Sequence, residues 1–293
     1  MNDLLRAFAD DLTREDKSPI TVRNYVNDIS LFARWVQETY GEDLDLTKTC
    51  ERDIIEYRAY LVTTKAAAPS TINRRLASLV KFFNFCISQK LAKTNPAQGI
   101  KGISVSLPPP KALDTSSLRK LLRTVHSQGN IKHIAILELL CGTACRVGEL
   151  VCIQKSQVTI GQRSGSVTIA HGKGRSAREV PLNLDVRKAL SKWIEIRPNT
   201  SNPYLFVNQR GQKLTPSGVW RIVKKYGELS GNPNITIHSL RHTVLTRLVR
   251  EYGFDLISVA RISGHQNVQT LSVYTQPTKE ALEEMMEKLS FTS

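Results

Sequence analysis

Three consecutive prolines, Pro108, Pro109 and Pro110, limit what this chain can fold into more than any other feature of its sequence. Each lacks a backbone N–H, so a helix cannot continue through them, and such a run favours extended polyproline II structure. We therefore interpret residues 101–113 as a linker between two domains, residues 1–100 and 114–293. A plain spacer would have the same sequence, but 293 residues are enough for two hydrophobic cores.

Residues 1–100 show the periodicity of a helical domain. Apolar residues recur three and four positions apart, which is typical of amphipathic helices. Ser18 before Pro19 is a typical helix start, and Gly41 is a typical helix end. The predicted helices cover residues 2–14, 18–40, 51–64 and a segment that opens at Pro69.

Residues 114–293 combine helices with one stretch of a different period. Helical patterns open near Asp114 and at Ile131, and Gly142-Thr143 should break the second. Alternation of period two predicts strands at 157–160, 166–170 and 178–182, and further helices are predicted at 184–196, 215–229, from 237 and at 278–290. The predicted fold is mainly α with a small antiparallel β-sheet in the C-terminal domain.

The basic charge of the chain lies mostly in its second part. The net charge is +15; residues 1–106 carry 15 Lys and Arg against 13 Asp and Glu, and the remainder carries 26 against 13. Such an excess favours a polyanionic partner, nucleic acid before membrane. No apolar run approaches the ~18 residues of a membrane span, and the first residues lack the features of a signal peptide. We therefore expect a cytoplasmic protein without a membrane partner.

The strongest chemical signal lies between His238 and Tyr274. His238, Arg241 and His242 are spaced i, i+3 and i+4, so a helix presents all three on one face. The next apolar segment ends at Gly264-His265, and Tyr274 follows shortly afterwards. Basic side chains with one tyrosine make a poor core, but they suit a site that holds a phosphodiester while a hydroxyl attacks it.

Together with two earlier segments, this stretch resembles the signature of the tyrosine recombinases, or phage-type integrases, including the Xer proteins. The family pattern is T-x-x-R-x-x-E-L, a hairpin lysine, H-x-x-R, G-H and a tyrosine. Here the first box is Thr143–Leu150, which contains Arg146 and Glu149, and the lysine is Lys173 at the tip of the second predicted hairpin. The matches follow the family's order across nearly the whole chain. Two departures are Ala144, where glycine is frequent, and Ser263, where leucine often precedes G-H.

The resemblance implies which groups act on the phosphate. Arg146 and Arg241 would bind the scissile phosphate, because guanidiniums offer forked donors to the charge that builds on its oxygens. Tyr274 would be the nucleophile, and since a phenol has a pKa of ~10 it needs a base, for which His238 is the better candidate. His265 would donate a hydrogen bond to the phosphate.

Three further residues complete the implied site. Lys173 would protonate the departing 5′ oxygen from its hairpin, Glu149 would orient Arg146 or Lys173, and His242 would support the site. The product would be a 3′-phosphotyrosine with a free 5′-hydroxyl, which keeps the bond energy, so neither ATP nor any cofactor or metal is expected. The sequence has no phosphate-binding glycine loop, no H-E-x-x-H and no C-x-x-C pair among its five cysteines.

The resemblance extends to the DNA contacts and the assembly. The N-terminal domain is similar to the family's core-binding domain, which would form a two-domain clamp on duplex DNA with the catalytic domain. Candidate phosphate contacts in its fourth helix are Thr71, Asn73, Arg74, Arg75 and Lys81, although an exposed polar face would look the same. The terminal helix 278–290 either folds back on its own domain or, as is common in the family, docks on a neighbouring protomer of a homo-tetramer on DNA.

Several functions remain open from the sequence. The leading hypothesis is a site-specific DNA recombinase, either the integrase of a mobile element or a Xer-like resolvase of chromosome or plasmid dimers. A type IB topoisomerase has the same chemistry, but the order of the boxes favours a recombinase. A DNA-binding relative without catalysis, or a basic helical regulator that matches by chance, would not be expected to keep the full residue set.

Overall fold

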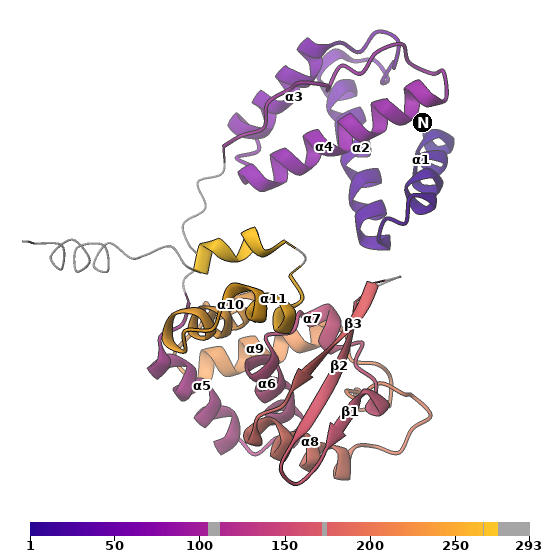
Figure 1. Cartoon of the computed structure of the whole chain (residues 1–293). Coiled ribbons are helices and arrows are strands. Elements are labelled where there is room, and N and C mark those ends of the chain that lie inside the picture. The colour runs from indigo at the N-terminus through magenta and orange to yellow at the C-terminus, as the bar shows by residue number, and fades with distance from the viewer. Residues whose placement is uncertain (105–111, 172–174, 266, 275–293) are drawn as a thin grey trace, which may run out of the picture. The chain divides into compact units, whose positions relative to one another are not determined.

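The computed structural model describes residues 1–104, 112–171, 175–265 and 267–274 (Figure 1). The chain forms two compact units, Met1–Leu107 and Pro108–Ser293. The described part is mostly helical with one three-stranded antiparallel sheet, which confirms the predicted fold class. Within these ranges no helix has the length and hydropathy to cross a membrane. The three prolines, the hairpin tip with Lys173 and the predicted helix 278–290 lie outside the described residues.

The described residues of the first unit form a bundle of the predicted helices. Their bounds are α1 (Asn2–Arg14), α2 (Pro19–Tyr40), α3 (Glu51–Thr63) and α4 (Pro69–Ser88). The Ser18 hydroxyl accepts a hydrogen bond from the Thr21 N–H at 3.1 Å, and Gly41 ends α2 with a φ of 74°. The core is rich in edge-to-face aromatic pairs such as Phe8 with Phe82, whose ring centroids are 5.3 Å apart.

The second unit surrounds α6, whose side chains are apolar on nearly every side and mostly buried. Its helices are α5 (Thr115–Ser127), α6 (Ile131–Thr143), α7 (Val147–Leu150), α8 (Leu184–Ile196), α9 (Pro216–Leu229), α10 (Ile237–Thr246) and α11 (Leu256–Ser263). One π-helical segment, Arg247–Glu251, follows α10, and the 3₁₀ segments are Lys155–Gln157 and Val268–Tyr274.

The sheet has the order β1-β2-β3, with strands Val158–Ile160, Gly165–His171 and Arg175–Pro181. Both pairings are antiparallel, and the register places Val167 opposite Val180 and Ile169 opposite Arg178. Figure 1 shows α7 and α11 close to β3; α7 contacts β2, α11 contacts β3, and α10 contacts α6. This arrangement brings together the segments that carry the motifs of the family.

Helix α6 ends at Thr143, within the predicted break at Gly142-Thr143, but Gly142 itself is still helical. A Cβ on Gly142 would lie 2.4 Å from Cγ2 of Val186, so this glycine allows α6 and α8 to pack closely. The turn is made instead by Ala144, in the left-handed region with a φ of 50°. That conformation costs a residue with a Cβ about 1 kcal/mol or more.

Candidate active site

Arg146 lies where the chain turns from α6 into α7. It is the N-cap of α7, and its backbone N–H donates to Oε2 of Glu149 at 2.8 Å. Its Nη1 donates to Oε1 of the same carboxylate at 3.1 Å and to the Gly264 carbonyl at 3.2 Å. The side chain is 45% exposed. The box therefore holds one edge of this guanidinium and leaves the rest accessible to a substrate.

Glu149 forms a second, two-pronged pair with Arg178 on β3. The Nη2–Oε2 distance is 2.7 Å and the Nη1–Oε1 distance is 3.1 Å, and both side chains are only 11% exposed. Burial raises the pKa of Glu149, but hydrogen bonds from Arg178 and from the Arg146 backbone lower it by more. The net result is a pKa below the usual value of a glutamate. The carboxylate is therefore ionised at neutral pH. Glu149 thus pairs with Arg146, as predicted, and also with Arg178.

Arg241 lies on α10 and is nearly buried, with 5% of its surface exposed. Its Nη1 donates to the Ala144 carbonyl, and its Nη2 donates to the Ser263 carbonyl at 2.8 Å. Burial, followed by repulsion from Arg146, lowers the pKa of Arg241 to about 10, which still leaves it charged at neutral pH. Arg146 and Arg241 thus bind adjacent carbonyls at the end of α11, and the structure brings the two predicted phosphate ligands together.

His265 joins this pair through the turn after α11. Its Nδ1 is 2.6 Å from the Ser263 hydroxyl, and Nη2 of Arg241 is 3.4 Å from its Nε2. Burial, followed by repulsion from Arg241 and Arg146, lowers the pKa of His265 to about 4, so the imidazole is neutral at neutral pH. A leucine in place of Ser263 could not make this contact. The departure from the family pattern therefore adds a polar partner for the histidine.

Tyr274 contacts His242 of α10, apart from the contacts of the arginines. Their rings pack edge to face with centroids 4.6 Å apart, and Nε of Arg250 donates to the Tyr274 carbonyl at 2.9 Å. Burial raises the pKa of Tyr274, and the Arg241 charge opposes that rise. The tyrosine is 8% exposed, which is the state of a phenol that is packed rather than presented to a substrate.

His238 occupies the first turn of α10 and is exposed. The helix predicted from the spacing of His238, Arg241 and His242 is confirmed, but Arg241 and His242 are buried. Burial lowers the pKa of His242, and the nearby His238 adds to the effect. Its Nδ1 lies 3.1 Å from the Thr246 hydroxyl, which is consistent with a supporting position.

Arg178 also belongs to this cluster, although its sequence pattern predicted only the start of a strand. Strand β3 in fact begins at Arg175, and Arg178 lies on the same side of the strand as buried Val180. A charged residue at an inward position of a strand needs a buried partner of opposite charge. That alternation, read with Glu149 in the first box, was the available signal.

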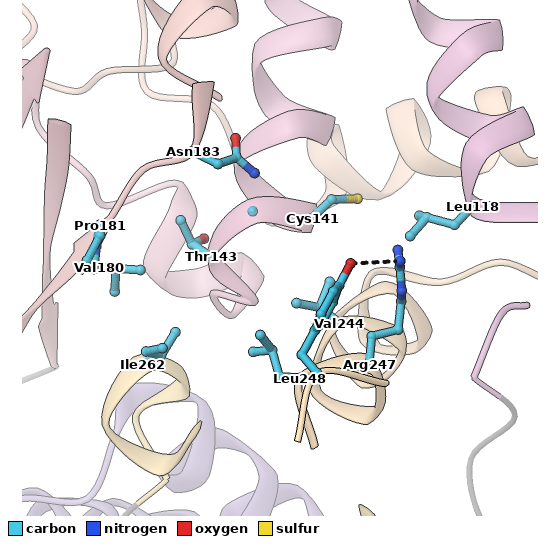
Figure 2. Close-up of a pocket in the computed structure, with 12 residues that line it drawn as sticks. Leu118, Cys141, Thr143, Val180, Pro181, Asn183, Val244, Arg247, Leu248 and Ile262 are labelled. Carbon is cyan, nitrogen blue, oxygen red and sulfur yellow. Dashed lines mark hydrogen bonds between the residues drawn. The ribbon is translucent and has the colours of Figure 1, made fainter. Parts of the chain in front are cut away.

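A cavity of about 310 Å³ lies beside the cluster (Figure 2). Thr143, Val180, Val244 and Ile262 line it, and they come from four elements that carry or adjoin the site: α6, β3, α10 and α11. Of the predicted catalytic residues that the structure describes, none lines this space. In the described ranges no group of three or more His, Cys, Asp and Glu side chains is arranged to hold a metal ion.

Two of the predicted DNA contacts, Arg74 and Arg75, share a buried carboxylate. Arg74 Nη1 pairs with Oδ2 of Asp28, and Nε of Arg75 lies 3.9 Å from its Oδ1. The Asp28 side chain is fully buried, whereas the Arg74 side chain is 38% exposed. Asp28 therefore pairs with the guanidinium of Arg74 and lies within ion-pair distance of the guanidinium of Arg75 on α4.

The other three predicted contacts have different surroundings. Asn73 binds Ile103 through both backbone groups, with distances of 2.9 and 2.7 Å, and so holds residues 101–104 against α4. Lys81 pairs with Glu15, the residue that follows α1, and Thr71 is half-buried in the first turn of α4. DNA contact by these five residues stays a prediction.

Comparison with known proteins agrees with the motifs. Residues 111–281 match the phage integrase family, and residues 5–90 match the phage integrase N-terminal SAM-like domain. TnP I resolvase of Bacillus thuringiensis is 32% identical over 98% of this chain and 100% of its own. Tyrosine recombinase XerD of Listeria monocytogenes is 31% identical over 97% of both chains.

A solved structure shares the fold. The XerH site-specific recombinase, in a post-cleavage complex with a palindromic difH substrate, superimposes with a TM-score of 0.77 at 22% identity, over 92% of this chain and 79% of that one. Family matches over both units and relatives above 30% identity across nearly the full length identify the chain. It belongs to the phage integrase family, as a tyrosine recombinase.

Proposed function

We propose that this recombinase attaches Tyr274 to the 3′ phosphate of a cut DNA strand. As a tyrosine recombinase it cleaves and rejoins DNA at specific sites. The observation that supports these residue roles best is the convergence of Arg146, Arg241 and His265 on the turn at Ser263-Gly264. Two fixed guanidiniums and a neutral imidazole are the donors that a phosphorane with two negative charges requires.

The proposed reaction is a reversible transesterification. The Tyr274 phenol gives its proton to His238, and its oxygen bonds to phosphorus while the bond to the 5′ oxygen breaks. Lys173 protonates that oxygen, and a 5′-hydroxyl from another strand later reverses the steps. Glu149 orients Arg146, and His242 supports the site from its buried position in α10.

The partner is duplex DNA, and we propose that the enzyme acts in the cytoplasm. The excess of positive charge after residue 106 supports a polyanionic partner, and XerH, which shares the fold, is bound to DNA in its complex. We assign residues 1–100 to core-site binding, 101–113 to the linker and 114–293 to catalysis. Exchange of the segment at 278–290 between protomers would complete a homo-tetramer on DNA.

The names of the relatives favour a resolvase over an integrase. TnP I is named a resolvase, and XerD and XerC are the names of several other relatives. The test begins with a duplex selected for binding from a random library. Two copies are placed as direct repeats on one supercoiled plasmid, and single copies on two separate plasmids.

A resolvase splits the first plasmid into two circles faster than it fuses the separate pair. A preference for fusion would instead indicate an integrase. Tyr274→Phe should bind the selected duplex but give neither product. Wild-type protein that binds the duplex yet recombines no pair of sites would overturn the proposal and favour a DNA-binding protein without catalysis.

A further inference from the structure

Arg178 links three elements of the active site. It lies on β3, its two terminal nitrogens bind Glu149 in α7, and its Nε donates to the Ile262 carbonyl in α11 at 2.7 Å. The Ile262 carbonyl is two residues before Gly264, whose carbonyl accepts from Arg146. With these contacts and only 11% of its side chain exposed, Arg178 is held in one position within the site.

The contacts of Glu149 show what Arg178 does there. Each carboxylate oxygen accepts two hydrogen bonds: Oε1 from Nη1 of Arg146 and Nη1 of Arg178, and Oε2 from the Arg146 backbone and Nη2 of Arg178. Both terminal nitrogens of Arg178 bind the carboxylate, whereas Arg146 uses one terminal nitrogen and its backbone N–H. Arg178 therefore holds the forked position on Glu149, and Arg146 does not.

Removing Arg178 would change the contacts of Arg146. Glu149 would lose two donors and its most buried counter-charge, and a buried carboxylate strongly favours a forked guanidinium partner. Arg146 is the nearest replacement, because its backbone and Nη1 already contact the carboxylate. Its fork would then turn toward Glu149 and away from the exposed side, where 45% of its side chain is accessible.

The charge of the cluster points in the same direction. Arg146, Arg178 and Arg241 carry three positive charges against one negative charge on Glu149, which leaves +2 among these four side chains. A phosphodiester passes from one negative charge to two during attack by oxygen. Preorganised positive charge stabilises the transition state most where negative charge develops. Loss of one positive charge from this cluster therefore slows the attack on phosphorus.

We propose that Arg178 is a positioning residue, which neutralises Glu149 and so leaves the Arg146 guanidinium available to the scissile phosphate. This inference rests on the proposed recombinase reaction. It predicts that the slower reaction after loss of Arg178 comes through a carboxylate that has lost its forked partner. Removing that carboxylate as well should then relieve the harm, which a merely structural role of Arg178 would not allow.

The test measures single-turnover formation of the protein–DNA adduct on the selected duplex, nicked near the cleavage point to trap the product. Arg178→Met should slow the adduct about 10²-fold. The double variant Arg178→Met with Glu149→Gln should form the adduct at least about tenfold faster than Arg178→Met alone, which a double-mutant cycle measures. Arg178→Lys, which keeps the charge without the fork, should stay within about tenfold of wild type. Duplex affinity should change little in every variant.

The outcomes separate this inference from the proposed function. A double variant as slow as Arg178→Met, or slower, overturns the inference while the wild type still forms its adduct. A wild type that forms no adduct overturns the proposed function instead. Thermal unfolding of each variant shows that it is folded at the assay temperature. If Arg178→Met is not, Arg178→Gln with and without Glu149→Gln gives the same comparison.

Discussion

Arg241 combines a chemical and a structural role in one side chain. Its guanidinium faces Arg146 and His265, yet two of its nitrogens hold the carbonyls of Ala144 and Ser263. Substitution therefore removes a proposed phosphate ligand and leaves two buried carbonyls without these donors, which costs about 1–3 kcal/mol for each unsatisfied group. Loss of activity and loss of stability must be separated at this position.

Arg241→Lys should keep the charge but lose the fork, and we expect adduct formation to fall about 10²-fold or more. Duplex affinity should change much less, because many other phosphate contacts supply binding. Gel-shift titration and adduct rates measure the two effects. Arg119→Lys on the exposed face of α5 is the matched control and should change neither. Equal losses of affinity and rate in Arg241→Lys would contradict the assigned role.

Two strongly lowered histidine pKa values predict how stability depends on pH. Burial lowers the pKa of His133 and of His265 to about 4. Between about pH 4 and pH 6.5 both are therefore neutral in the folded chain, whereas in the unfolded chain, with a pKa of about 6.5, they are protonated. The unfolded state then binds more protons, and stability falls as pH drops from about 6.5 to about 4. Each half-buried group contributes about 1–2 kcal/mol to this fall after allowance for solvent screening.

His133→Gln and His265→Gln should each flatten that pH dependence, measured by urea unfolding at several pH values. His133 contacts Tyr226 in α9, away from the catalytic cluster, so its variant should form the adduct at the wild-type rate. His265→Gln should slow the adduct as well. An unchanged slope in both variants would contradict the depressed pKa values.

Sequence reasoning at this scale reached the residues that belong to a fixed pattern. Arg146, Glu149, Arg241 and His265 were predicted from their boxes, and the structure places them in contact. Arg178 was missed because no local spacing links it to Glu149, 29 residues earlier. Only the tertiary fold pairs a strand residue with a helix cap, and a single sequence carries that information weakly.

At the scale of elements, local signals predicted most boundaries. The hydroxyl of Ser18 and the carboxylate of Asp114 cap α2 and α5 as expected, because capping depends on neighbouring residues alone. Gly142 misled the prediction, since its role is close packing against α8 rather than a turn. The π-helical segment after α10 was also unexpected, and it has no sequence signal comparable to a cap.

The β2–β3 hairpin carries the lysine that we propose as the general acid. The register from Ser166↔Pro181 to His171↔Arg175 fixes the strands that lead to Lys173. If Lys173 protonates the departing 5′ oxygen, Lys173→Ala should slow cleavage at least about 10²-fold, in the usual range for acid catalysis. A duplex with sulfur in place of that oxygen has a leaving group that needs no proton. It should restore Lys173→Ala almost to the wild-type rate; equal slowing on both duplexes would contradict the role.

Helix α4 gives a contrast between a phosphate contact and a structural residue. Lys81→Ala should lower the slope of log affinity against log salt by about 1, the amount for one phosphate contact. Asn73→Ala should leave that slope nearly unchanged and lower the stability of the first unit, because Asn73 holds Ile103. Fluorescence anisotropy titrations across a salt series measure the slopes. No change of slope in Lys81→Ala would remove it from the predicted contacts.

At the scale of the whole molecule, the site depends on residues far apart in the chain. Nη1 of Arg146 and the Gly264 carbonyl are separated by 118 positions, yet they lie 3.2 Å apart. Periodicity could predict the helices that carry them but not this contact. The order of the family boxes predicted it indirectly, since a resemblance over nearly the full chain implies one shared fold.

The buried Tyr274 also belongs to this scale. Its ring packs on His242 and burial raises its pKa, so its use as a nucleophile requires a rearrangement of the last described residues. Assembly of several protomers on DNA is the event we propose to drive it. This predicts that isolated protein reacts slowly and that adduct formation rises more than linearly with protein concentration on a duplex with two sites.

The most direct test of the account is to identify the amino acid that becomes bonded to DNA. Wild-type protein is incubated with the nicked selected duplex, digested with protease and nuclease, and the DNA-linked peptide is sequenced by mass spectrometry. We expect a 3′-phosphate on the Tyr274 oxygen and no adduct with Tyr274→Phe. A DNA linkage at another residue, or an adduct that survives in Tyr274→Phe, would contradict it.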